Sequence, residues 1–96
     1  MGYKAIVING KDNVATALTS LVKGTRISVE IQDRVETITL ISDIPTGHKF
    51  ALKDMAGGDP IIKYGESIGQ SIAKICCGEY VHVHNITSRP KGEDDE

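Results

Sequence analysis

Hydrophobic and polar positions alternate with a period of two between residues 26 and 41. Isoleucine and valine alternate with polar residues over 26–31, the polar segment 32–34 interrupts the pattern, and the alternation resumes over 35–41. Because successive side chains of a strand point to opposite faces, this pattern predicts a β-hairpin. Apolar residues occur on both faces toward the end of its second strand, which indicates that this strand is the more central one.

The N-terminal segment predicts a strand and then a helix. Residues 3–8 form a short apolar run that ends at an Asn-Gly turn dipeptide, as in a buried strand. Asp12 or Asn13 can cap the start of the following helix, and Gly24 its end. The spacing i, i+3, i+4, i+7 and i+8 gives one apolar stripe: Val14, Ala17, Leu18, Leu21 and Val22. We therefore expect one short N-terminal helix.

The second half of the chain predicts short extended segments separated by glycine and proline. These segments are residues 48–53, 60–64, 67–73 and 80–85.

Two of these segments belong to an internal echo. Residues 44–52 and 75–83 share the pattern Ile-x-x-Gly followed by two apolar positions, at a constant offset of 31 that pairs Phe50 with Val81. This echo predicts two related loop–strand units about a pseudo-twofold axis.

Composition supports a mainly β domain. The chain of 96 residues has 13 Ile and 7 Val against only 4 Leu, and side chains branched at Cβ favour strands. Residues 1–86 are predicted to form one small domain. Residues 87–96 are polar and end in four consecutive acidic residues, so we expect a disordered acidic tail.

Charge and hydropathy exclude several classes of partner. The net charge is −2, and without the four terminal acids the remaining 11 basic and 9 acidic residues give only +2. This is too little for a nucleic-acid-binding patch, and no apolar run reaches the roughly 18 residues of a membrane span. Cys76 and Cys77 are adjacent, so they cannot staple distant segments. We read them as free thiols of a cytoplasmic protein.

The candidate chemistry lies in the two echoed segments, which hold all three histidines. In an extended segment at residues 80–85, Tyr80, His82 and His84 share one face, while Val81 and Val83 point into the core. Two imidazoles about 7 Å apart along a strand can converge on one divalent ion. They can also bind a carboxylate, move a proton, or simply be solvated.

The third histidine, His48, joins this face only under one condition. Strict alternation places it on the core face with Phe50, so it reaches the site only if its strand begins at Lys49. On that strand Lys49 and Lys53 are expected on an open face with Ala51 between them.

Lysines beside histidines favour an anionic small molecule, although solvated lysines are the alternative. Lys63 lies among apolar neighbours and is followed by Tyr64. The candidate substrate-binding residues are therefore Lys49, Lys63 and Tyr64.

Three motifs in order are similar to the N-terminal domain of the altronate/galactarate dehydratase family, which includes sulfolactate sulfo-lyase. They are DIPTGHKFALKD at residues 43–54, IKYGESIG at 62–69 and GEYVHVHN at 78–85. The resemblance implies a SAF domain of the β-clip fold, similar to type III antifreeze domains.

The resemblance also implies a function. In this family the domain accompanies a much larger catalytic region that eliminates water or sulfite from a hydroxylated carboxylic acid, with a divalent metal, commonly iron. We expect that region on a separate large catalytic subunit or outside this sequence, and an anionic sugar acid as substrate. His48, His82 and His84 are then the candidate catalytic residues, with His82 and His84 as metal ligands.

Four functions stay open. The chain is either the small subunit of a dehydratase for altronate or galactarate, or the small subunit of a sulfolactate sulfo-lyase. The alternatives without chemistry are a SAF module that binds a carboxylated sugar or a protein partner, and a structural fragment that needs no ligand.

Overall fold

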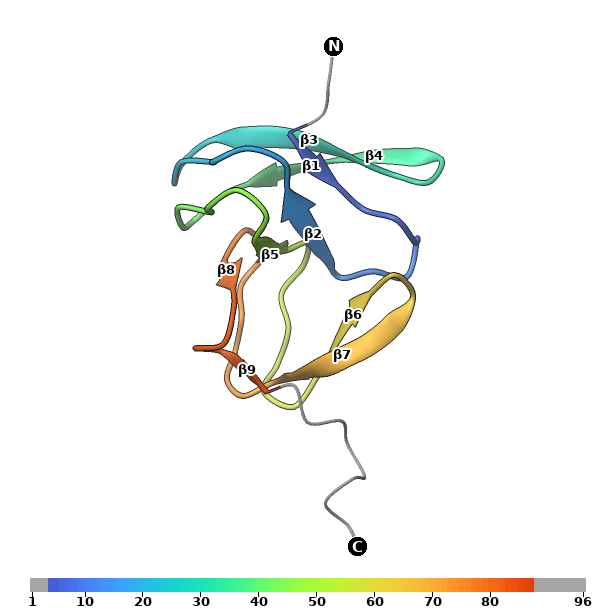
Figure 1. The fold of residues 1–96 in the computed structure, drawn as a ribbon, viewed down its shortest axis with the longest axis vertical. Coiled ribbons are helices and arrows are strands. Elements are labelled where there is room, and N and C mark those ends of the chain that lie inside the picture. Colours follow the sequence, from blue (N-terminus) through green and yellow to red (C-terminus); the bar gives the residue numbers. More distant parts are fainter. Residues whose placement is uncertain (1–3, 88–96) are drawn as a thin grey trace, which may run out of the picture.

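The computed structural model describes residues 4–87, and over this part of the chain the protein is built from short strands without a helix (Figure 1). The prediction of a mainly β fold is confirmed. The strands are β1 (Ala5–Ile6), β2 (Val14–Ala17), β3 (Arg26–Ile31), β4 (Arg34–Thr39), β5 (Lys49–Ala51), β6 (Pro60–Lys63), β7 (Glu66–Ser71), β8 (Tyr80–Val81) and β9 (Ile86–Thr87).

All strand pairs are antiparallel and form three small sheets. The largest has the order β1-β2-β5-β8, β3 pairs with β4, and β7 lies between β6 and β9. The β3–β4 and β6–β7 hairpins lie at opposite ends of the molecule, with β2, β5 and β8 between them (Figure 1). The described residues contain no helix that could cross a membrane.

The predicted N-terminal helix is wrong. Its first residues form β2, which pairs with β1 on one side and β5 on the other. Leu18 and Val22, two residues of the proposed stripe, are 51% and 64% exposed. A strand between two neighbours buries consecutive side chains on both faces, so an apolar cluster such as Val14 and Ala15 satisfies this site without helical periodicity.

The hairpin prediction is confirmed, but its second strand is not central. β3 and β4 pair from Arg26–Thr39 to Ile31–Arg34, and Gln32 turns the chain with a positive φ of 56°. Within the described residues β4 pairs with β3 alone, and Val35 is exposed. The expected buried strand at residues 3–8 is shorter, because β1 is an edge strand of two residues.

The internal echo is a structural repeat. In both loops the N–H of the glycine donates to a strand carbonyl at 2.8 Å: Gly47 to Ala17, and Gly78 to Ala51. In both, the residue after the glycine donates its N–H to the residue three positions earlier. The repeat extends to two further loops, beginning at Leu21 and Met55, whose glycines also have positive φ.

Two of these four loops are closed by a hydrogen bond to the side chain of their own fifth residue. In the loops beginning at Met55 and Ile75, the fifth residue is acidic. Its carboxylate accepts a hydrogen bond from the N–H of the second residue, Asp59 from Ala56 at 2.9 Å and Glu79 from Cys76 at 2.8 Å. Each carboxylate therefore holds its own turn closed.

The interior consists of two hydrophobic clusters that share the central strands. Ala15 and Phe50 belong to the first cluster, while their neighbours Val14 and Ala51 belong to the second. The second cluster also contains Val81. Ala51 is fully buried, so the expectation that it lies on an open face with Lys49 and Lys53 is wrong.

The strand predicted at residues 80–85 is also shorter than expected. β8 ends at Val81, and residues 82–85 form a turn. Val83 is consequently 76% exposed rather than in the core. Of the predicted tail, Thr87 lies in β9, and residues 88–96 lie outside the described residues.

Candidate functional site

Three imidazole rings gather around the ring of Tyr80. The ring centroids of His48, His82 and His84 lie 5.7, 5.5 and 5.4 Å from that of Tyr80. Tyr80 and His82 are stacked with an interplanar angle of 9°, and the centroids of His48 and His82 are 4.7 Å apart. We call these four residues the imidazole cluster. The structure thus brings all three histidines predicted from the sequence together.

His48 reaches the cluster because of where its strand begins. β5 starts at Lys49, so His48 lies on the turn that follows Gly47 and is released from the alternation that buries Phe50. The condition set from the sequence is therefore met. Phe50 pairs with Tyr80 across β5 and β8, which places the Tyr80 hydroxyl oxygen 2.7 Å from His48 Nδ1.

A buried asparagine holds the loop that carries the other two histidines. Asn85 Oδ1 accepts a hydrogen bond from the backbone N–H of His82 at 3.0 Å, and its Nδ2 donates to the Tyr80 carbonyl at 2.8 Å. Asn85 is 5% exposed. Asn85 was not among the site residues predicted from the sequence, although an asparagine directly after a polar-apolar alternation is a recognisable turn signal.

All the effects that shift the pKa of His82 act in the same direction. Loss of solvation lowers the pKa of His82, and the positive charges of His48, Lys49 and His84 lower it further. Each cause disfavours the imidazolium form. The neutral imidazole, whose lone pair can accept a proton or bind a metal ion, is therefore favoured at His82.

Lys49 connects the imidazole cluster to a second lysine. Burial lowers the pKa of Lys49, and repulsion from Lys63 lowers it further. Lys63 Nζ lies 4.9 Å from the centroid of the Tyr64 ring. Among residues 4–87 no carboxylate lies within ion-pair distance of either lysine. The charges of Lys49 and Lys63 are therefore not neutralised by an ion pair within this part of the chain.

Lys53, the other lysine predicted on the open face of this strand, lines a separate hollow. Lys53 is exposed and lines a hollow of about 400 Å³ with Arg34 and Glu36, whose side chains form an ion pair at 2.8 Å.

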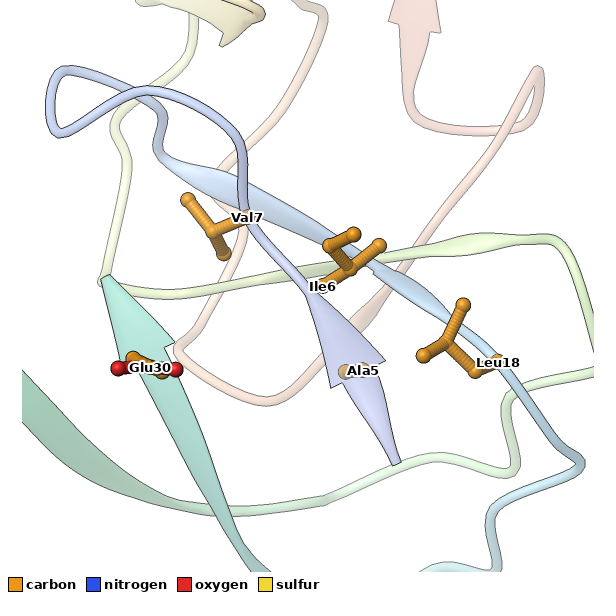
Figure 2. Close-up of a pocket in the computed structure, with 5 residues that line it drawn as sticks. All are labelled: Ala5, Ile6, Val7, Leu18 and Glu30. Carbon is orange, nitrogen blue, oxygen red and sulfur yellow. The ribbon is translucent and has the colours of Figure 1, made fainter. Parts of the chain in front are cut away.

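A second hollow of about 320 Å³ lies at the edge strand β1 (Figure 2). Its wall is mainly apolar and is formed by Ala5, Ile6, Val7, Leu18 and Glu30. Neither hollow includes a residue of the imidazole cluster. His48 and His82 are half-buried and His84 is exposed, so the cluster lies on a surface that another surface can cover.

The sequence matches one family over almost its whole length. Residues 3–89 match the altronate/galactarate dehydratase SAF domain. The chain belongs to this family. The resemblance inferred from the three motifs is therefore confirmed, and the strands described above are those of a SAF domain.

Curated relatives of this SAF domain are lyases. An altronate dehydratase of Escherichia coli (strain K12) is 50% identical over 80 residues, which are 83% of this chain and 15% of that protein. A galactarate dehydratase (L-threo-forming) of the same strain is 36% identical over 76 residues, or 79% of this chain and 14% of that protein. The chain thus spans only about 15% of the length of these dehydratases.

Another relative is a subunit of a sulfo-lyase rather than a dehydratase. The (2R)-sulfolactate sulfo-lyase subunit alpha of Paracoccus pantotrophus is 44% identical over 52 residues, which are 54% of this chain and 78% of that subunit.

The donor set of the SAF domain fits an incomplete metal site. Within residues 4–87 no three His, Cys, Asp or Glu side chains are placed to hold one ion. His82 and His84 can supply two imidazole ligands, whereas His48 Nδ1 is already engaged by Tyr80. Catalytic zinc sites take three protein ligands, so a metal held by these two imidazoles in the same way would need a further ligand from another polypeptide region.

Of the two cysteines, Cys77 adds no reactive thiol to this site. Both are free, as expected. Burial raises the pKa of the Cys77 thiol, and the charges of Asp54 and Glu36 raise it further. Its Sγ donates to the Leu52 carbonyl at 3.3 Å. A thiol held protonated in this way is a poor nucleophile.

Proposed function

We propose that this chain is the SAF-domain subunit of a hydro-lyase that eliminates water from a sugar acid such as altronate or galactarate. In this proposal it completes the active site of a separate large catalytic chain. One observation supports it above the others: three imidazoles gather around Tyr80, and the charge of Lys49 acts both on His82 and on Lys63, in a member of a dehydratase family. The free, adjacent Cys76 and Cys77 agree with a cytoplasmic location.

Elimination beside a carboxylate makes three demands. A base must remove a proton, the developing enolate must be stabilised, and the leaving hydroxyl must gain a proton or a Lewis acid. Lys49 and Lys63 bind the substrate carboxylate, with Tyr64 beside them. The imidazole of His48 contacts the leaving hydroxyl, and closure of the partner over the cluster excludes water.

His82 and His84 are the residues of this chain that would hold a divalent metal. When bound, such a metal, with iron as the candidate, supplies Lewis acidity at the leaving oxygen.

The lysines give a direct test of substrate binding. Replacement of Lys49 or Lys63 by Gln removes one positive charge from the carboxylate site, and we expect about tenfold weaker binding of the acid for each. Binding is measured by calorimetry on the assembled pair of chains. The control is Lys23→Gln, an equal loss of charge at an exposed position remote in sequence. Equal affinities for all three variants and the unchanged chain would contradict the assignment.

A second candidate reaction is the elimination of sulfite from sulfolactate. It is supported by the similarity to a sulfolactate sulfo-lyase subunit alpha, which is 44% identical over 52 residues. The higher identity to the altronate dehydratase favours dehydration.

Co-purification followed by a substrate panel separates these candidates. The tagged chain is isolated with the large chain that accompanies it, and the pair is assayed with altronate, galactarate and sulfolactate. Turnover of a sugar acid supports dehydration, and turnover of sulfolactate alone supports the second candidate. Binding of a sugar acid without turnover would instead identify a non-catalytic binding module.

The histidines are tested in the same pair of chains. Replacement of both His82 and His84 by Ala should abolish turnover and leave the circular dichroism spectrum and Tm unchanged. Undiminished turnover would remove the site assignment.

A further inference from the structure

The proposed chemistry uses three histidines and two lysines but leaves Tyr80 without a role. Tyr80 is the residue at the centre of the cluster, in ring contact with all three imidazoles. Its hydroxyl oxygen lies 2.7 Å from His48 Nδ1. We propose that Tyr80 is a positioning residue whose hydroxyl donates to Nδ1 and so holds neutral His48 in the tautomer protonated at Nε2.

The direction of this hydrogen bond follows from the donors and acceptors present. A neutral imidazole has one nitrogen that donates and one that accepts, and a phenol has a single proton. If Nδ1 carried the proton, the Tyr80 proton would need another acceptor, which could only be solvent. Among residues 4–87 its hydroxyl has no other hydrogen-bond partner. Donation from Tyr80 to Nδ1 satisfies both groups with one bond.

The hydroxyl is held in place by contacts of the rest of the tyrosine. The Tyr80 ring packs partly buried against the first hydrophobic cluster and stacks on His82. Its carbonyl accepts the hydrogen bond from Asn85 Nδ2. Because the aromatic body cannot move independently of the core, the oxygen defines both the orientation and the tautomer of His48.

The tautomer divides the three histidines into two roles. With its proton on Nε2, His48 has no lone pair at that nitrogen, so it donates a hydrogen bond to an oxygen and cannot bind a metal ion there. His82 and His84 are not constrained by a tyrosine hydroxyl in this way. The identity of the accepting oxygen, the leaving hydroxyl of the substrate, rests on the proposed function, but the tautomer itself does not.

Nitrogen-15 NMR of the imidazole side chains tests the proposal on the full chain alone. At about pH 8, where imidazoles are neutral, long-range proton–nitrogen correlations distinguish a protonated from an unprotonated ring nitrogen. The signals of His48 are assigned by their loss in His48→Gln. We expect an unprotonated Nδ1 and a protonated Nε2. In Tyr80→Phe we expect the Nδ1 signal to shift toward the average of two exchanging tautomers.

Tyr64→Phe is the matched control, because it removes the same hydroxyl from an exposed tyrosine outside the cluster and should leave the His48 signals unchanged. A protonated Nδ1 in the unmodified chain, or an unchanged pattern in Tyr80→Phe, would overturn the proposal. The unmodified chain alone decides the direction of the bond, so a poorly folded variant does not prevent the test. Absent turnover with the expected tautomer would refute the proposed function and leave this inference standing.

Discussion

The charges around His82 determine how the protein responds to acid. Loss of solvation and three neighbouring cationic groups lower the pKa of this imidazole from its ordinary value of 6.5. In the unfolded chain these effects are absent, so the unfolded state binds a proton at a pH at which the folded state does not. Stability therefore falls as the pH decreases from above 6.5 through the lowered pKa of the folded state.

This sign gives a prediction for His82→Gln. The variant lacks the titrating group, so its free energy of unfolding should decrease less between about pH 8 and about pH 5.5 than that of the unmodified chain. Urea unfolding at a series of pH values measures the difference. Lys23→Gln, which changes an exposed charge remote in sequence, should keep the original pH dependence. Equal slopes for the unmodified chain and His82→Gln would show that the imidazole is not perturbed.

For individual residues, the sequence predicted that the three histidines lie together, but it did not predict the turn and the hydrogen bond that bring them together. Tyr80, His82 and His84 are in contact as expected, yet the strand that was to align them ends at Val81. The rings meet because a turn held by Asn85 brings them together. The hydrogen bond from Tyr80 to His48 joins residues 32 positions apart, and no local pattern reports such a contact.

Among the elements, the turn at residues 82–85 depends on one side chain. Replacement of Asn85 by Ala leaves the buried N–H of His82 and the carbonyl of Tyr80 without their partners, which we expect to cost about 1–3 kcal/mol of unfolding free energy. Chemical denaturation measures this loss. Val83→Ser on the same turn changes an exposed side chain and should stay within about 0.5 kcal/mol. Similar losses in both variants would mean that Asn85 does not hold the turn.

The repeated loops allow a comparison of two glycines in equivalent positions. Both Gly58 and Gly78 have positive φ, 92° and 84°, so an Ala at either position costs about 1–2 kcal/mol of backbone strain. A Cβ at Gly58 would meet nothing within 4 Å, whereas one at Gly78 would clash with the Thr39 carbonyl oxygen.

We therefore expect Gly78→Ala to lower the unfolding free energy by about 3 kcal/mol or more, and Gly58→Ala by only the strain term. Thermal unfolding of both variants provides the measurement. Equal losses of unfolding free energy would mean that backbone strain at positive φ accounts for the whole effect. This result would argue against the close approach of the Gly78 loop to β4.

The accuracy of the element predictions follows the range of the interactions. The β3–β4 hairpin was predicted because its register is set locally, by alternation and by a turn at Gln32. β2 was not predicted, because its apolar residues also match a helical stripe. It forms a strand because it pairs with β1 and β5. Pairing with distant segments overrode the local pattern. The echo identified two loops of four, because the other two lack the initial Ile.

At the scale of the whole molecule, the two hydrophobic clusters belong to one cooperative unit. Alternate residues of β2 and β5 enter opposite clusters, as Phe50 and Ala51 illustrate. Neither cluster can lose its packing while these strands remain in place for the other. A chain of this size with a shared core is expected to unfold in one step.

Substitutions in each cluster test this coupling. Ile27→Ala in the first cluster and Ile61→Ala in the second should each lower the unfolding free energy by about 2–5 kcal/mol and retain a single transition. The transition is followed by backbone circular dichroism and by tyrosine fluorescence, which should give the same midpoint. Separate midpoints in either variant would indicate that the clusters unfold independently.

The two loops closed by a carboxylate differ from the loop of His48 in one backbone donor. In the loops of Asp59 and Glu79, the acidic side chain is committed to the N–H of the second residue. In the loop of His48 that second residue is Pro45, which has no N–H to offer. An acid at position 48 would find no N–H at the second residue, so an imidazole at this position costs the turn no hydrogen bond. Because Pro45 has no N–H, the side chain at position 48 is not needed to close the turn and can take part in the imidazole cluster.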